Sequence, residues 1–372
     1  MLPSTLSKLC SSGAAARTTS SAFFSSGANP RHQNFRNSQN SSQNQNSTRR
    51  NRQHQQERNG DKTNGGGGYG RWGRGCTYRK RRQYDDAIQV LQLALEEAEE
   101  RKEELPITRV YDEMANTYYE KLNFFDEADK FFRIVIQRLV QLHGKKDFDP
   151  EFIGVSLKLA DILAHKGELE SAESGFKHCV RRQMKVMEEH MKKFSVAHGA
   201  LIEDRHTVDT YGHVYTDPIA LFGMTLEAYA NFLVNYCQEN RLAEAEEYMD
   251  EVMKISYQIY GASSSHTINM LNNFGATLVL KNRFELARKY LSIGVDRILY
   301  VNECAHMLPG YYCNYAEALF HTGHKEEAVE FARKAVQMAR SGDERLRKYT
   351  QQFLKDLEKD LNKGKPKSWW FF

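Results

Sequence analysis

Apolar residues recur along this chain with a long and regular period. A small residue is followed twelve positions later by an alanine, and apolar residues then stand four and seven positions further on, most clearly from Ala160 and from Ala316. Spacings of four and three lie on one face of a helix, so each unit predicts two antiparallel helices with apolar faces turned toward each other. The alanines of the second helices are Ala87, Ala128, Ala172, Ala245, Ala287 and Ala328.

The intervals between these alanines indicate the domain organisation. They are 41, 44, 73, 42 and 41 residues, so one interval holds about 31 additional residues. Small side chains let two helices approach to about 8 Å, and larger residues fill the groove between successive pairs, so a pair is stable only in a stack. We expect an all-α fold, a right-handed α-solenoid of about five to six helix pairs over residues 83–340, with a spacer at about 190–218. A polar-faced capping helix at 343–362 is expected to close the stack.

The N-terminal segment has a different composition. Residues 1–82 contain 15 Lys/Arg against 2 Asp/Glu, and the first acidic residue is Glu57. A basic, Ser-rich start without acids is typical of a mitochondrial transit peptide, although a disordered tail has the same composition. We expect residues 1–75 to be a transit peptide and a disordered Gln/Asn/Gly-rich linker. The first helix of the first pair would fall at 71–82, and the sequence leaves open whether it exists.

No set of residues has a spacing typical of catalysis or metal binding. The six cysteines form no CxxC pair. Asp209 and His213 stand four apart in the spacer, but His206 and His213 are seven apart and no third ligand joins them in helical register, so a surface loop is the preferred interpretation. We expect no catalytic residue, no cofactor and no metal, and no apolar run reaches the roughly 18 residues of a membrane-spanning helix. Residues 83–372 hold 37 Lys/Arg against 46 Asp/Glu, which argues against a nucleic-acid partner.

The repeat spacing and the alternation of small and large residues resemble the tetratricopeptide repeat, in its 42-residue variety. Three segments, the leader and the closing helix resemble the mitochondrial tetratricopeptide repeat protein 19 family more closely. These segments are Tyr111–Asn116, Ser156–Ala160 and Phe222–Met224, the last followed by Leu226 and Ala228. The resemblance implies a non-enzymatic scaffold on the matrix side of the mitochondrial inner membrane. It would support assembly and maintenance of respiratory complex III and help clear fragments of the Rieske subunit, so the implied partners are complex III subunits and those fragments.

A solenoid binds its partners on its concave face, which the first helices line. Asn116 matches the carboxylate-binding members of the superfamily, but Asp112 stands where they need a lysine. We therefore expect an extended or helical peptide of neutral or basic character, although many of these positions would also be explained by simple exposure to water. The residues expected in the groove are Asn116, Tyr119, Leu157, Asp161, His165, Val234, Gln238, Asn269, Asn272, Val279, Glu317, Phe320 and His321.

Two other functions remain open from the sequence. A cytosolic cargo adaptor of the kinesin-light-chain type shares the 42-residue repeat and the motif around Gly261, His266 and Asn272. An RNA-associated repeat protein would use the basic Gly/Arg segment near residues 65–75. The C-terminal residues 363–372 combine three lysines with four consecutive aromatic residues, a composition that favours peripheral contact with the inner membrane. The alternatives are that the aromatic residues fold back onto the last helix or stay disordered.

Overall fold

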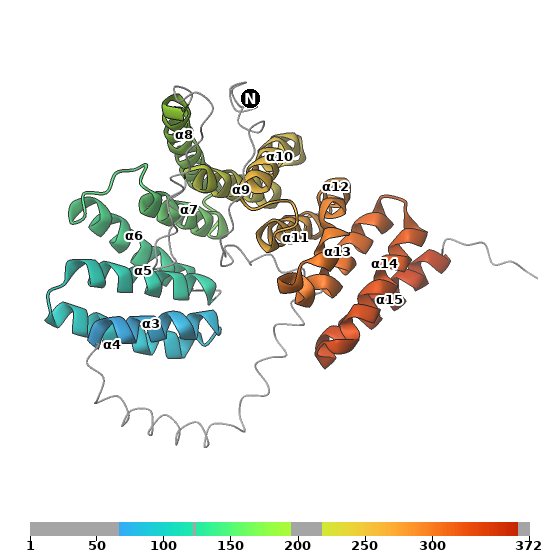
Figure 1. Cartoon of the computed structure of the whole chain (residues 1–372), viewed down its shortest axis with the longest axis horizontal. Helices are drawn as coiled ribbons and strands as arrows, with labels where there is room; N and C mark the ends of the chain where they lie inside the picture. The colour runs from blue at the N-terminus through green and yellow to red at the C-terminus, as the bar shows by residue number, and fades with distance from the viewer. Residues whose placement is uncertain (1–66, 122–123, 195–217, 364–372) are drawn as a thin grey trace, which may run out of the picture. The chain divides into compact units, whose positions relative to one another are not determined.

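The fold is all-α, as the sequence predicts, and the repeats are helix pairs of the tetratricopeptide type. The computed structural model describes residues 67–121, 124–194 and 218–363, and all regular structure in these ranges is helical (Figure 1). The described residues up to Phe232 form one compact unit, the N-terminal unit, and those from Leu233 onward form a second, the C-terminal unit. All six repeat alanines, from Ala87 to Ala328, are completely buried, which confirms the register read from the sequence.

The N-terminal unit contains three successive helix pairs and most of a seventh helix. Each helix packs against the next along the chain from α3 to α8, and the first helices α3 and α5 also contact each other. The elements are α3 (Gly67–Lys80), α4 (Tyr84–Glu100), α5 (Glu104–Glu120), α6 (Phe125–Gln141), α7 (Pro150–His165), α8 (Leu169–Phe194) and α9 (Pro218–Tyr236), whose last four residues belong to the C-terminal unit.

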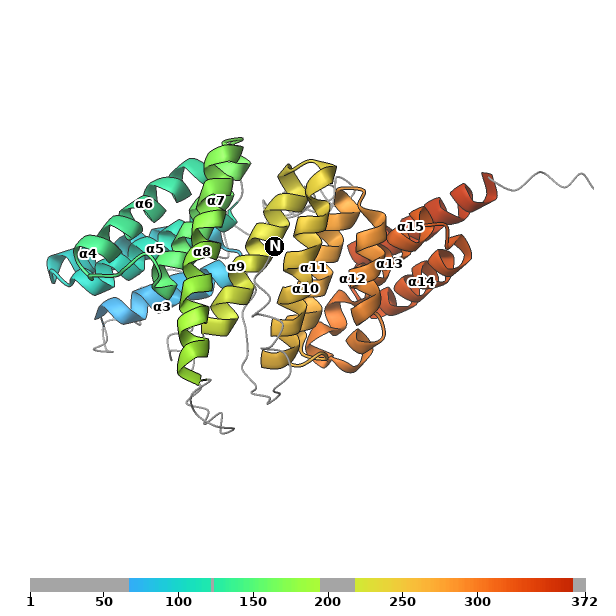
Figure 2. The same cartoon turned by 90° about the horizontal axis from the view of Figure 1, so that it is seen from above.

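The C-terminal unit is also built from successive packed helices. Its helices follow one another side by side in chain order (Figure 2). They are α10 (Leu242–Ile259), α11 (Ser265–Leu280), α12 (Phe284–Gly294), α13 (Leu308–His321), α14 (Lys325–Met338) and α15 (Glu344–Lys363), with short 3₁₀ helices at Glu239–Arg241, Arg297–Tyr300, Asn302–Met307 and Ala339–Ser341. Helix α15 is the expected capping helix: Phe353 and Leu357 are buried, and it packs on α14 and α13.

Helix α3 corrects the boundary expected for the N-terminal linker. The sequence suggested a linker through residue 75, whereas a helix begins at Gly67 and completes the first pair. This helix can pack as the first helix of a pair because of Gly75, which stands twelve residues before Ala87 and so holds the small-residue position of the repeat. A Cβ at Gly75 would lie 2.6 Å from Leu91 Cδ2, and the equivalent Gly275 lies against Leu291 in the same way. Helix pairs that pack together among the described helices are thus α3–α4, α5–α6, α7–α8, α11–α12 and α13–α14.

Several expectations fall outside the described residues. The leader up to residue 66, the centre of the spacer at 195–217 and the aromatic tail from residue 364 are among them. The spacer begins later than expected, because α8 is a 26-residue helix that runs through to Phe194. Among the described helices, none combines the length and apolarity needed to cross a membrane.

Candidate functional site: the first-helix surface

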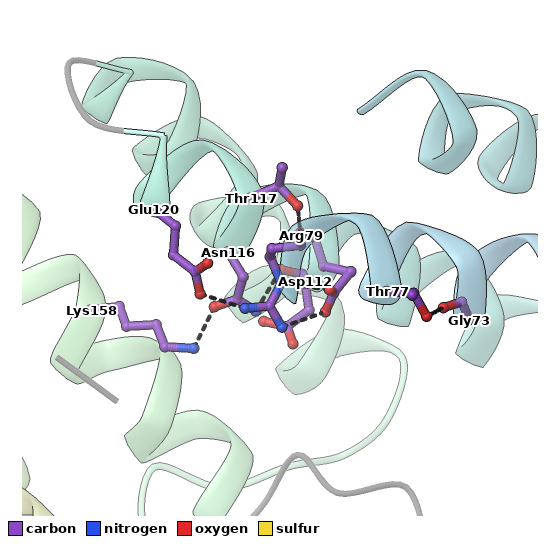
Figure 3. A network of polar contacts seen from close by, with 9 residues as sticks. Gly73, Thr77, Arg79, Asp112, Asn116, Thr117, Glu120 and Lys158 are labelled. Atoms are coloured by element: carbon purple, nitrogen blue, oxygen red, sulfur yellow. Dashed lines mark hydrogen bonds and ion pairs between the residues drawn. The ribbon is translucent and has the colours of Figure 1, made fainter. Parts of the chain in front are cut away.

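The first helices of the N-terminal unit are joined by polar side chains. Arg79 near the end of α3 donates from Nε to Glu113 Oε1 over 2.6 Å, and its Nη1 donates to Glu120; both carboxylates are on α5 (Figure 3). The Arg79 and Glu113 side chains are only 14% and 3% exposed. Burial alone would disfavour the guanidinium, but the two carboxylates raise the pKa of Arg79 above its ordinary value. This buried ion pair fixes α3 on α5.

A second bridge joins α5 to α7. Lys158 Nζ donates to Asn116 Oδ1 over 2.5 Å, and Asn116 Nδ2 donates to the backbone oxygen of Asp112 (Figure 3). The ammonium group also lies 5.4 Å from the centre of the Phe132 ring. Burial lowers the pKa of Lys158, and the nearby Asp112 carboxylate opposes that shift. The amide expected to contact a ligand is therefore occupied by a lysine from the next repeat.

The same two helices meet again at a carboxylate. The Tyr119 hydroxyl on α5 donates to Asp161 Oδ2 over 2.5 Å, and His165 Nε2 lies 3.5 Å from the same oxygen. The His165 ring stacks on Phe125 with 4.7 Å between centroids and 8° between planes. Burial raises the pKa of Asp161, although His165 and the Tyr119 hydroxyl act in the opposite direction. Asp161 and His165 remain 19% and 29% exposed, so a partner can reach both.

The C-terminal unit repeats this arrangement of an aromatic ring, an imidazole and a carboxylate. His321 stacks on Phe284 with 4.0 Å between centroids, and its Nε2 lies 3.5 Å from Glu317 Oε1. Each histidine is the last residue of a first helix, and each phenylalanine is the first residue of the preceding second helix. We call these two sets the imidazole shelves.

The structure leaves some of the predicted groove residues partly exposed and buries others. Leu157, Val234 and Val279 are at most 5% exposed, so they pack in the interior instead of facing a groove. Burying these apolar side chains is more favourable in free energy than exposing them to water on the surface of a groove. The remaining predicted residues keep part of their surface, and their role in binding stays a prediction. They are Tyr119, Asp161, His165, Gln238, Asn269, Asn272, Glu317, Phe320 and His321, whereas Asn116 is buried and accepts from Lys158.

Sequence reasoning missed Arg79 and Lys158. A signal for Lys158 exists in the spacing: Asn116 and Lys158 are 42 residues apart, and so are Tyr119 and Asp161. Complementary side chains separated by one repeat length meet on neighbouring first helices. No group of three or more potential metal ligands occurs among the residues with described positions.

Comparison with known proteins agrees with the fold and with the resemblance. The tetratricopeptide repeat family profile matches residues 309–341, which hold the α13–α14 pair. The chain is 27% identical over 212 residues to the protein named tetratricopeptide repeat protein 19 homolog, mitochondrial, of Drosophila melanogaster, covering 57% of this chain and 50% of that protein. It is also 27% identical over 257 residues to tetratricopeptide repeat protein 19, mitochondrial, of Homo sapiens, covering 69% and 62%. The resemblance to this family is confirmed.

The chain spans about half to two thirds of the length of these relatives. Among solved structures, BtubC (BKLC) of P. vanneervenii is similar with a TM-score of 0.48 and 15% identity, over 76% of this chain and 94% of that one.

Proposed function

We propose that this chain is a non-enzymatic mitochondrial scaffold on the matrix side of the inner membrane. By binding protein segments, it supports the assembly and maintenance of respiratory complex III and helps clear fragments of the Rieske subunit. The observation that carries the proposal is the similarity to mitochondrial tetratricopeptide repeat protein 19 over 57–69% of the chain. The repeats themselves are a protein-binding architecture.

The imidazole shelves are the parts of the first-helix surface best suited to hold a partner segment. Each offers a flat aromatic face and a carboxylate next to an imidazole that can donate or accept. Asp161 and Glu317 give both shelves an acidic edge, so a neutral or basic segment suits them. The buried ion pair of Arg79 and the buried Lys158 bridge act differently, because they hold the helices that carry this surface.

The test is a cell line that lacks the protein. We expect lower complex III activity and accumulation of Rieske fragments, with both restored by the wild-type chain. A double variant with His165→Ala and His321→Ala should restore both poorly. The matched control is His178→Ala, because His178 on α8 is 40% exposed and lies outside both shelves. Normal complex III activity together with normal fragment levels in the null cells would refute the proposal.

Location is tested separately from activity. A fusion of residues 1–60 to a fluorescent protein is expected to enter mitochondria, because these residues are basic and almost free of acids. A fusion that stays in the cytosol contradicts the localisation and favours the cargo-adaptor alternative.

A further inference from the structure

Helix α9 carries a single charged side chain. Among its 19 residues, Glu227 is the only Asp, Glu, Lys or Arg. Leu226 and Ala228 on either side of it are at most 4% exposed, whereas Glu227 keeps part of its surface. A charge in so apolar a helix is unfavourable unless an interaction offsets the loss of water around it.

The packing of α9 turns Glu227 away from α8. The ring of Phe176 on α8 lies 6.2 Å from Tyr229 and 5.1 Å from Phe232, measured between centroids. The Tyr229 hydroxyl also donates to Glu173 Oε1 on α8 over 3.0 Å. Glu227 stands two positions before Tyr229, about 200° around the helix axis, so its carboxylate points to the side of α9 opposite α8.

Repeat position places Glu227 on the first-helix surface. It stands six residues before Leu233, which is twelve residues before Ala245 and so takes the small-residue position of this repeat. The equivalent residue of α11 is Asn269, which the sequence predicts in the groove, and that of α7 is Gly154. A Cβ on Gly154 would meet no atom within 4 Å. The preceding first helix therefore presents no side chain at the equivalent position.

The Glu227 carboxylate also differs from the other carboxylates of this surface in its contacts. Glu113 accepts from Arg79, and Asp161 accepts from the Tyr119 hydroxyl. Among the residues with described positions, no cation and no hydrogen-bond donor contacts the Glu227 side chain. Burial alone raises the pKa of Glu227 to about 7. Glutamine has nearly the same shape and would avoid this cost, so the fold itself does not require the charge.

We propose that Glu227 binds a cationic side chain of a partner polypeptide, with arginine as the best fit. A guanidinium group beside the carboxylate replaces the lost water and restores the charged form. Arginine fits because it is weakly hydrated and can donate two parallel hydrogen bonds to one carboxylate. A metal ion does not fit, because such ions take several oxygen ligands and Glu227 supplies one carboxylate.

This contact rests on the proposal that the chain works by binding partner segments. It names a residue outside the imidazole shelves and the chemical group that this residue selects. Because the shelves also have an acidic edge, a basic segment suits both.

Peptide selection tests the contact directly. The probes are acetylated, amidated nonapeptides with a central arginine, a central glutamate, or a central citrulline, the neutral analogue of arginine. The other positions hold an equal mixture of alanine, leucine, serine and tyrosine. The full-length protein is immobilised, and the retained peptides are quantified by mass spectrometry. We expect arginine peptides to be retained at least about fivefold over citrulline peptides, and glutamate peptides least of all.

Two variants locate the selection. In Glu227→Gln the ratio of arginine to citrulline peptides is expected to fall to about one. The matched control is Glu96→Gln, which removes the same charge from an exposed position on the second helix α4 and should leave the ratio unchanged.

Thermal unfolding separates a binding role from a structural one. At about pH 8, above the raised pKa, Glu227→Gln should melt no lower than the wild type, because an ionised carboxylate without a partner is lost. A carboxylate that holds the fold together would give a lower Tm instead.

Three results would overturn the proposal. They are no preference of the wild type for arginine over citrulline, an unchanged preference in folded Glu227→Gln, and a lower Tm of that variant. None of these measurements uses complex III activity in null cells, so failure of the Glu227 contact is distinguishable from failure of the proposed function.

Discussion

Replacing Arg79 by methionine tests whether residues 67–80 form the first helix of the solenoid. The Glu113 carboxylate beneath Arg79 is 3% exposed, and it accepts from two guanidinium nitrogens, Nε at 2.6 Å and Nη2 at 3.3 Å. Methionine keeps most of the apolar stem but leaves the carboxylate buried without its cation. Breaking one side of a buried ion pair costs about 3–5 kcal/mol, far more than loss of a surface pair.

The assay is thermal unfolding of the full-length protein, followed by circular dichroism. For a unit of this size, about 3–5 kcal/mol corresponds to a fall in Tm of roughly 6–20 °C. The control is Arg133→Gln on α6: Arg133 is 61% exposed and its partner Asp129 is one helical turn away, so the Tm should change by less than about 2 °C. If Arg79→Met melts within about 1 °C of the wild type, α3 is not docked on α5 as described, and the first pair is incomplete.

Three further results are expected. Ala172→Leu or Ala328→Leu should cost about 1–3 kcal/mol, because each alanine is fully buried at a close helix crossing, and unchanged melting of both would show that the repeat register is wrong. Burial lowers the pKa of His266 to about 4, whereas in the unfolded chain this imidazole binds a proton once the pH falls below about 6.5. The free energy of unfolding should therefore fall between pH 7 and pH 4. In His266→Phe this fall should be less steep. Equal slopes of Tm against pH would contradict this origin. Finally, removing residues 364–372 should weaken sedimentation with cardiolipin-containing liposomes, because lysines and aromatics favour an anionic interface, and equal binding would exclude the tail from membrane contact.

The sequence was most informative where one residue type has one physical purpose. An alanine at a helix crossing is needed in every pair, so its recurrence predicted the fold and the register. The existence of helix α3 was left open because its glycines and arginines give it the composition of a linker. What holds it is tertiary: Gly75 admits Leu91, and Arg79 reaches Glu113.

The candidate site was less predictable than the fold. Repeat position indicated Asp161 and His165 as surface residues, and both are partly exposed next to Tyr119. Repeat position predicted that Leu157 faces the groove, but this side chain is buried. Position within a repeat fixes the direction of a side chain but not which residues cover it.

The bridges between first helices also make the repeats non-interchangeable. Glu113 and Lys158 occupy the same repeat position, each two residues before the small residue of its helix, Ala115 and Ala160. Arg79 faces Glu113 in the native order. Excising the second repeat would present Arg79 with Lys158, so two cations would meet where an ion pair now stands. Repeat arrays usually shorten or lengthen by whole units with little penalty at each junction. Here the opposite charges of Glu113 and Lys158 at one repeat position restrict which repeat can follow which.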